Sequence, residues 1–398
     1  MIKISENVKN VHSDIRGDIY MHALELEKSG YKILKLNTGN PASFGFKMPQ
    51  SIKERIISDV DSSLGYCDIR GMEKSRDAIC NYHKLRGIKN INDNDIFIGN
   101  GVSEIAGMII NALIGKDDEI LVPTPCYSLW INYTYLSGGI PRYYKCDEHN
   151  EWNPDIDSIK KNISKNTKAI LIINPNNPTG ALYNKETLLE ITEIARKNNL
   201  VIISDEIYDR LVLDGEQHIP IAALSTDVCI ITVNGLSKSH CICGLRCGWM
   251  CVSGDERQEL LKAFVNLASV RLCSNALMQL VIPDALSDIA YTENMTHPNG
   301  RLTRQRNAVM EELDKIEGIS YVKNLAAFYL FPKLDIEKYG FESDREFARK
   351  LLDEKHILVV PGSGFSCEDN MHFRIVMLPK ENELRSAIKN IGEFLSTK

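Results

Sequence analysis

The sequence predicts an α/β protein with a large domain, built on a mainly parallel sheet flanked by helices, and a smaller α+β domain. Between about residues 95 and 255, short strands that are apolar throughout alternate with longer helical patterns. Strands that are apolar on both faces are typical of parallel sheets covered by helices on each side. After about residue 295 the pattern changes to short strands with flanking helices, and a length of 398 residues allows two or three domains.

In the large domain each expected strand is followed by a polar turn or a helix. The expected strands are Ile96–Ile98, Glu119–Val122, Ala169–Ile173, Val201–Ser204 and Cys229–Val233. The expected helices are Val102–Ile114, Tyr127–Leu136 and Glu186–Lys197. Ligands of such sheets bind at the carboxyl ends of the strands, so polar motifs directly after these strands are candidate site residues.

The smaller domain begins with a long polar helix and contains short strands. Its expected elements are the helix Gly300–Ile316, the strands Ala326–Pro332, Ile357–Val360 and His372–Met377, a helix opened by a capping box at Ser343–Glu346, and the helix Glu381–Phe394. We expect an N-terminal arm and part of the small domain over 1–45, the large cofactor-binding domain over 46–295, and the small C-terminal domain over 296–398.

Composition and charge exclude several classes of protein. The 47 basic and 53 acidic residues leave a net charge of −6, which offers no electrostatic attraction for nucleic acid or an anionic membrane. The longest apolar runs are strand-sized, far below the roughly 18 residues of a membrane span, and the first residues lack the apolar stretch of a signal peptide. Eleven scattered cysteines suit a reducing compartment. We therefore expect a soluble cytoplasmic protein.

A lysine and an arginine follow the last of these strands. Lys238 ends the motif Asn234–Lys238, and burial at a strand end favours the neutral amine, which is the form that attacks a carbonyl. Taken alone, a surface lysine at a loop tip is the commoner alternative. Arg246 lies eight residues later between two glycines, so it can approach a phosphate closely and bind it with two parallel hydrogen bonds.

Two more motifs follow neighbouring strands. In Ser204–Tyr208, a buried carboxylate of Asp205 must be paired to stay charged, and a protonated heterocyclic nitrogen is one suitable partner; a helix cap is the alternative. In Asn174–Gly180, two prolines and a glycine restrict the backbone more than a plain turn requires. These positions lead us to expect a ligand at this edge of the sheet.

The motif Gly99–Ser103 joins a strand to a helix, and its amides with the helix dipole can hold an anion. A dinucleotide fingerprint would need a glycine at the position of Glu104, so that interpretation fails. A phosphate without a dinucleotide remains open.

Together these motifs resemble the fold-type I, pyridoxal-phosphate-dependent aminotransferases of class I/II. The sequences Asn-Pro-Thr-Gly, Ser-Asp-Glu-Ile-Tyr and Ser-Lys-x7-Arg occur in the family's order, and the resemblance runs from about residue 37 to 376. Within the family, the sequence is most similar to bacterial alanine (glutamate–pyruvate) aminotransferases at residues 13–17, 39–46, 99–104 and 235–238.

The resemblance implies that pyridoxal 5′-phosphate is the cofactor and that Lys238 binds it covalently. It implies that Asp205 pairs with the pyridine nitrogen, that Tyr208 and Asn177 hydrogen-bond the ring hydroxyl oxygen, and that Tyr127 stacks on the ring. The residues implied for the phosphate are Val102, Ser103, Ser237, Arg246 and, from the neighbouring subunit, Tyr66. A homodimer with shared active sites follows from the last of these.

Arg374 is similar to the arginine that binds the substrate α-carboxylate, with help from Gly39 and Asn177. The implied reaction is a ping-pong amino transfer between an amino acid, alanine or glutamate, and a 2-oxo acid, pyruvate or 2-oxoglutarate. Arg16 in the N-terminal arm is a candidate for binding the side-chain carboxylate of glutamate; a salt bridge between arm and body is the equally weighted alternative.

Several positions depart from the family's pattern. Ser13 stands where close relatives carry tyrosine, Ala326 where many carry glycine, and His240 near the lysine is interpreted as filling an aromatic slot. The spacing of Cys241, Cys243, Cys247 and Cys251 matches no common zinc pattern, so no metal is expected. His12, His83 and His372 are interpreted as structural, because they have no partners at ligand spacing.

Other functions remain open on the same motifs. Aspartate, aromatic and branched-chain amino acids are alternative amino donors. A carbon–sulfur lyase or a decarboxylase can use the same fold and cofactor, and neither needs an oxo-acid acceptor. A non-catalytic regulator is disfavoured, because the lysine and aspartate are retained and only about 45 residues precede the core motifs.

Overall fold

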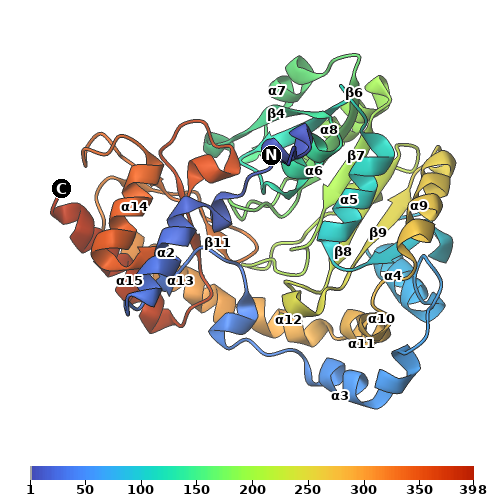
Figure 1. The fold of residues 1–398 in the computed structure, drawn as a ribbon, viewed down its shortest axis with the longest axis horizontal. Coiled ribbons are helices and arrows are strands. Elements are labelled where there is room, and N and C mark those ends of the chain that lie inside the picture. Colours follow the sequence, from blue (N-terminus) through green and yellow to red (C-terminus); the bar gives the residue numbers. More distant parts are fainter. Residues whose placement is uncertain (1) are drawn as a thin grey trace.

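An eight-stranded sheet forms the centre of the larger part of the molecule in the computed structural model, which describes residues 2–398 (Figure 1). The strand order is β2-β9-β8-β7-β6-β3-β4-β5. Neighbouring strands from β8 to β4 are parallel, whereas β9 and β5 are antiparallel to their neighbours. The strands are β2 (Ile96–Gly99), β3 (Glu119–Thr124), β4 (Ile140–Asp147), β5 (Asn153–Pro154), β6 (Thr167–Ile173), β7 (Val201–Asp205), β8 (Ile230–Gly235) and β9 (Gly248–Ser253). The predicted α/β class and mainly parallel sheet are confirmed.

Helices cover both faces of this sheet because its central strands are apolar on both sides. In β6, Ile170 and Ile172 pack into the core on one face, and Leu171 and Ile173 pack into the core on the other. The first core includes residues of α4 (Glu73–Leu85), α8 (Lys185–Asn198), α10 (Ala276–Leu280) and α11 (Ile282–Ser287). The second includes residues of α5 (Val102–Leu113), α6 (Leu129–Leu136) and α9 (Gln258–Arg271).

The C-terminal part forms a separate core of its own, to which the N-terminal segment contributes (Figure 1). Its helices are α2 (Asp18–Lys28), α13 (Arg301–Leu313), α14 (Asp344–Lys355) and α15 (Glu381–Ser396). Its strands pair as β1 (Leu34–Lys35) with β13 (Ile357–Leu358), β10 (Ile319–Ser320) with β12 (Lys333–Leu334), and β11 (Tyr329–Leu330) with β15 (Phe373–Val376) and β14 (Val360–Pro361). The domain boundaries stay a prediction.

The remaining helices are α1 (Glu6–Lys9), α3 (Gln50–Asp59), α7 (Ile156–Asn162) and α12 (Ile289–Thr296). Two predicted elements differ locally. The strand expected over Ile357–Val360 is split into β13 and β14, which pair with different partners. At the start of α14, Ser343 accepts the amide of Glu346, but the Glu346 carboxylate accepts the amide of Glu342, so the capping is shifted by one residue. Within residues 2–398 no helix has the length and apolarity needed to span a bilayer.

Candidate active site

Three predicted residues follow three adjacent parallel strands. Asn177 lies in the loop after β6, Asp205 ends β7, and Lys238 follows β8. Because these strands are parallel, their carboxyl ends lie at one edge of the sheet. At this edge Lys238 Nζ donates a hydrogen bond to the carbonyl oxygen of Gly39 at 2.9 Å. The segment that contains Gly39 therefore reaches the lysine across 199 residues of sequence.

Asp205 is a buried carboxylate, 4% exposed. Its oxygens accept hydrogen bonds from Trp130 Nε1 at 3.0 Å and from the Ile207 amide at 3.3 Å. Burial raises the pKa of Asp205 to about 6, against the opposing effect of these bonds and of the Lys238 charge. A cationic nitrogen facing this carboxylate would favour its charged form. Such a nitrogen is the partner that the sequence predicts.

Arg374 is a guanidinium held in the protein interior, 1% exposed. Its Nη1 donates to Asn177 Oδ1 at 2.8 Å and its Nη2 donates to the Asn37 carbonyl, while Nε has no hydrogen-bond partner. Within residues 2–398 no carboxylate forms an ion pair with it. Burial lowers its pKa from the ordinary arginine value. A buried cation without a counterion is suited to bind an anionic ligand.

Aromatic residues and a glycine hold this arginine in place. The guanidinium lies 4.5 Å from the ring centroid of Tyr329 and 4.7 Å from that of Phe365. The Tyr329 hydroxyl is 2.8 Å from the Tyr208 hydroxyl. A Cβ at Gly39 would lie 2.2 Å from the Tyr329 hydroxyl oxygen, so the close approach of this backbone requires glycine. Gly39 thereby lies between the lysine and the tyrosine that supports the arginine.

The predicted phosphate residues surround the start of α5. Val102 and Ser103 are its first two residues, and their amides lack partners within the helix. A Cβ at Gly101 would lie 2.3 Å from Arg246 Nη2, and one at Gly248 would lie 2.6 Å from the Val102 amide nitrogen. The arginine therefore lies against the helix N-terminus, where both favour an anion.

Ser237 lies just beyond the end of β8, two residues after Gly235. Gly235 pairs with Gly248 across the β8–β9 ladder. The sequence did not predict β9, whose antiparallel direction puts its first residue, and Arg246 just before it, at the carboxyl edge of the parallel strands. Because β9 runs antiparallel to β8, an arginine eight residues after Lys238 lies at the same edge of the sheet as the lysine.

Three other predicted residues, Ser13, Tyr66 and Tyr127, form no hydrogen bond with this cluster within residues 2–398, although Tyr127 lies close enough to Arg374 to act on its charge. Tyr66 is 86% exposed, and Tyr127 is half-buried. Ser13 and Tyr127 line a cavity of about 270 Å³, together with Asn132. Asn132 holds the N-terminal arm, because its side chain accepts the amide of His12 at 3.2 Å and donates to the carbonyl of His12 at 2.7 Å.

Arg16 is exposed and forms no ion pair within residues 2–398. The arm does contact the body through a salt bridge, but the arm residue is Asp14, whose carboxylate is 2.7 Å from Arg345 Nη1. The alternative that Arg16 itself makes this salt bridge is therefore wrong, and its role toward glutamate stays a prediction.

His240 is fully buried, and both of its ring nitrogens have neutral hydrogen-bond partners. Its Nε2 donates to the Ala285 carbonyl at 2.9 Å, so Nδ1 accepts from the Ser239 hydroxyl at 2.9 Å. Burial lowers its pKa to about 4, and its ring stacks on Tyr291. These contacts agree with a filling role. Ala326 is also buried, and its amide donates to the Gly180 carbonyl at 3.0 Å.

The cysteines near the lysine make separate contacts. Cys243 Sγ lies 3.2 Å from Asn40 Oδ1, and Cys247 Sγ lies 3.5 Å from the Met278 carbonyl oxygen. The interpretation of His372 needs correction. It was expected to have no partners at ligand spacing, yet the chain turn at 367–372 brings Cys367 and Asp369 next to its ring.

Sequence reasoning missed several residues that support the site. Trp130 binds Asp205 from the first turn of α6, and Tyr329 links Tyr208 to Arg374. The position of Trp130 three residues after Tyr127 was the available signal for the first. Glu206 was also missed: it is buried, accepts a hydrogen bond from Ser204 Oγ at 2.9 Å, and its pKa is raised to about 8 by burial.

The geometry fits the cofactor that the sequence predicts. An amine, a buried carboxylate with a raised pKa, and an arginine at a helix N-terminus surround one edge of the sheet. These groups match an aldehyde, a ring nitrogen and a phosphate, which are the three reactive or charged parts of pyridoxal phosphate.

Comparison with known proteins agrees with this arrangement. The chain is 46% identical over 394 residues to the glutamate-pyruvate aminotransferase AlaA of Haemophilus influenzae, covering 98% of each chain. It resembles the crystal structure of an aminotransferase from Escherichia coli with a TM-score of 0.97 and 41% identity, covering 100% of this chain and 98% of that one. An alanine aminotransferase from Pyrococcus furiosus matches with a TM-score of 0.95 and 37% identity, covering 100% of both.

The family model described as Aminotransferase class I and II matches residues 31–391, which include every part of the cluster from Asn37 to Arg374. The family and these relatives share pyridoxal phosphate as cofactor. The chain belongs to the class I and II aminotransferases.

Proposed function

We propose that this aminotransferase moves the amino group between alanine or glutamate and pyruvate or 2-oxoglutarate. The observation that carries the proposal is the link made by the segment Asn37–Gly39, whose carbonyls accept hydrogen bonds from both Arg374 and Lys238. A substrate α-carboxylate bound to Arg374 would thus have its α-carbon on the side of the amine. The relatives named for glutamate–pyruvate and alanine transamination support this choice of substrates.

Each residue then has a defined task. Bound pyridoxal phosphate supplies the electron-accepting ring that carries the amino group from one substrate to the other. Lys238 Nζ would hold the cofactor through its aldehyde carbon, and as a free amine it would take the α-proton and return it as an acid. Asp205 would keep a positive charge on the ring nitrogen, and Tyr208 and Asn177 would orient the ring through its hydroxyl oxygen. Arg374 binds and orients the carboxylate, and Gly39 leaves room for it.

The first test concerns the lysine. Lys238→Ala should abolish turnover of alanine with 2-oxoglutarate, and its circular dichroism spectrum should stay that of the wild type. Lys47→Ala, a change of an exposed lysine outside the cluster, is the control and should keep full activity. Full activity in Lys238→Ala would refute the assignment.

A second test separates transamination from the other reactions of this fold. Each amino acid of a panel is added to the purified holoenzyme, and the visible absorption of the bound cofactor is followed. Alanine and glutamate should bleach it, and pyruvate or 2-oxoglutarate should restore it. Product formed at full rate without any oxo acid would indicate a lyase or a decarboxylase instead.

Arg16 is the candidate for distinguishing glutamate from alanine. In Arg16→Ala, KM for glutamate should rise about tenfold, since one exposed charge pair is lost, while KM for alanine should change little. Arg349→Ala, an exposed arginine of α14, is the matched control. Equal losses for both amino acids would remove Arg16 from the substrate site.

A homodimer is supported by exposed apolar side chains near Tyr66. These side chains are Ile57, Val60, Leu64, Tyr66, Val270 and Leu272. If Tyr66 completes the phosphate site of the partner, mixing Tyr66→Ala subunits with Lys238→Ala subunits creates hybrid dimers with one intact site, and activity should reappear. If no activity reappears although hybrids form, Tyr66 does not act across the interface. The cytoplasmic location stays a prediction from composition.

A further inference from the structure

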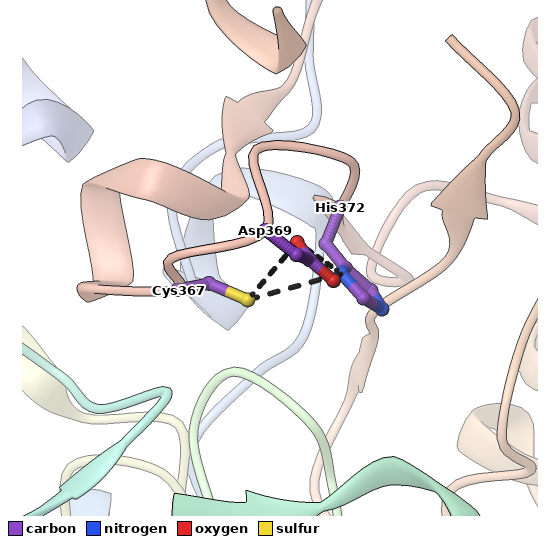
Figure 2. A group of neighbouring side chains, drawn as sticks. All are labelled: Cys367, Asp369 and His372. Carbon is purple, nitrogen blue, oxygen red and sulfur yellow. Dashed lines mark hydrogen bonds and ion pairs between the residues drawn. The ribbon is translucent and has the colours of Figure 1, made fainter. Parts of the chain in front are cut away.

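Three side chains converge in the loop that leads into β15, outside the aminotransferase site (Figure 2). Cys367 Sγ lies 3.5 Å from Asp369 Oδ1 and 3.8 Å from His372 Nδ1. His372 Nδ1 lies 3.0 Å from Asp369 Oδ1. Figure 2 shows the sulfur, the carboxylate and the ring nitrogen pointing toward one another from a single turn of the chain. A thiol, a carboxylate and an imidazole are all ligands of zinc.

The spacing of these atoms is close to that of a zinc site. Bonds of about 2.3 Å to sulfur and about 2.0–2.2 Å to nitrogen and oxygen place the donor atoms of a tetrahedral site about 3.4–3.6 Å apart. The three observed distances, 3.0, 3.5 and 3.8 Å, lie around that range, so small side-chain rotations suffice. We propose that Cys367, Asp369 and His372 bind one divalent transition-metal ion of the zinc class, with water in the fourth position.

The surroundings fix the imidazole in the required orientation. His372 Nε2 is 3.4 Å from Glu148 Oε1, and Glu148 is itself paired with Lys333 at 3.1 Å. This contact is an ion pair without hydrogen-bond geometry, and a carboxylate near the outer nitrogen favours the proton there, which leaves Nδ1 for a metal. Phe331 stacks on the ring at 4.8 Å with an interplanar angle of 10°, and Trp152 contacts it edge-on.

Metal binding leaves the charge of the cluster unchanged. Without metal, His372 and Asp369 form an ion pair, with Nδ1 2.9 Å from Asp369 Oδ2. On binding, the ion displaces one proton from Nδ1 and one from the Cys367 thiol, so its two positive charges replace those two protons. The thiolate, the carboxylate and the neutral imidazole then balance the ion without excess buried charge.

Solvent reaches the ligands through a cavity of about 290 Å³ that Cys367, Asp369 and Glu148 line. The loop also joins the two parts of the molecule, because the Thr124 hydroxyl donates to the Ser366 carbonyl at 2.5 Å. Arg374 follows His372 by two residues. A bound ion would therefore brace the loop that leads to the substrate-binding arginine.

The test uses the holoenzyme after removal of metal with a chelator. Zinc is titrated against a chromophoric zinc indicator, and cobalt is added separately to record the visible d–d bands of tetrahedral coordination. Wild type should bind one zinc ion per chain more than Cys367→Ser or Asp369→Asn. Glu148→Gln should weaken binding about 10–100-fold, as expected for a group that orients a ligand.

Cys273→Ser is the matched control, because Cys273 is a partly buried cysteine outside the cluster. It should keep the stoichiometry and the cobalt spectrum of the wild type, whereas Cys367→Ser should lose the tetrahedral bands. Cofactor absorbance and circular dichroism verify that each variant is folded. Equal zinc stoichiometry and equal cobalt spectra in wild type and folded Cys367→Ser would overturn the proposal. The three side chains would then be a hydrogen-bonded cluster without a metal.

Discussion

Two arginines are almost equally buried but are neutralised differently. Arg306 in α13, 2% exposed, donates from Nη1 and Nη2 to the two oxygens of Asp214 at 2.7 Å each. Arg374 on β15, 1% exposed, donates only to neutral oxygens of Asn177 and Asn37. The first charge is balanced within the fold, whereas the second is balanced by no carboxylate of residues 2–398.

This difference separates a structural charge from a binding charge. An isolated buried ion costs several kcal/mol, because the interior replaces water poorly. The rings of Tyr329 and Phe365 offset part of that cost through cation–π contacts, each of about 0.5–2 kcal/mol. The rest is offset only when an anion binds. An unpaired buried arginine beside a candidate nucleophile is therefore a stronger indication of a substrate site than an arginine in a well-formed ion pair.

The largest expected effect is that of Arg374→Met on catalysis. Loss of one partner of a buried charge pair costs about 2–5 kcal/mol, so kcat/KM for alanine should fall about 100-fold or more, mainly through KM. The melting temperature should stay the same or rise, since the variant removes a charge that the fold does not balance. Steady-state kinetics and thermal denaturation of the holoenzyme measure both. An unchanged KM would contradict the proposed role.

Arg306→Met should lower the stability and leave KM unchanged, the opposite of what we expect for Arg374→Met. Asp214 would keep its contact with Lys323 at 2.7 Å, so we expect a loss of about 3 kcal/mol in the free energy of unfolding, at the lower end for a broken buried pair. KM for alanine should be unchanged. Urea denaturation and kinetics on the same preparation test this. If instead KM rose while the stability was kept, the distinction between the two arginines would be wrong.

The sequence predicted the central elements well, because burial on both faces makes their apolar content unmistakable. β6, β7 and α8 lie within two residues of their expected bounds. β9 was missed although its residues are fully buried, and its antiparallel insertion between β2 and β8 depends on distant segments that local sequence does not show. In the smaller part, β11 and β13 lie inside predicted strands, whereas β1, β10 and β12 were not predicted, because pairing with distant segments alone defines them.

In the site, too, the residues next to buried strands could be predicted from the sequence, whereas their distant partners could not. Lys238 and Asp205 could be proposed from chemistry, because each directly follows a buried strand. Their partners could not: Trp130 is 75 residues from Asp205, and Tyr329 is 121 residues from Tyr208. Arg374 was identified through the family resemblance alone. That it lacks a counterion is visible only once the chain is folded.

A substitution with a smaller expected effect on KM is Asn177→Asp, which should give Arg374 an internal counterion. In Asn177→Asp, the new carboxylate would lie next to Arg374 Nη1, which now donates to Asn177 Oδ1. It would compete with the substrate carboxylate, and KM for alanine should rise about tenfold, equivalent to about 1.4 kcal/mol. The melting temperature should rise above that of Asn177→Ala.

Asn177→Ala is the control for this change, because it removes the hydrogen bond and any contact with the cofactor hydroxyl without adding charge. Kinetics with alanine and thermal denaturation compare the two variants. A KM in Asn177→Asp no higher than in Asn177→Ala would mean that Arg374 is not free to accept an internal counterion.

The smallest effect concerns pH. Hydrogen bonds from Arg306 and Lys323 outweigh burial and lower the pKa of Asp214 to about 2, below the value of about 3.9 in an unfolded chain. The stabilisation is therefore complete above that unfolded value and is lost as the pH falls from about 4 toward 2.

We expect a loss of only about 1 kcal/mol, because solvent partly screens the pair. Denaturation between about pH 5 and 2 should show a shallower decline for Arg306→Met than for wild type, while Arg374→Met, which removes no ion pair, should keep the wild-type slope. Identical slopes in wild type and Arg306→Met would show that the Asp214 pair does not contribute to acid sensitivity.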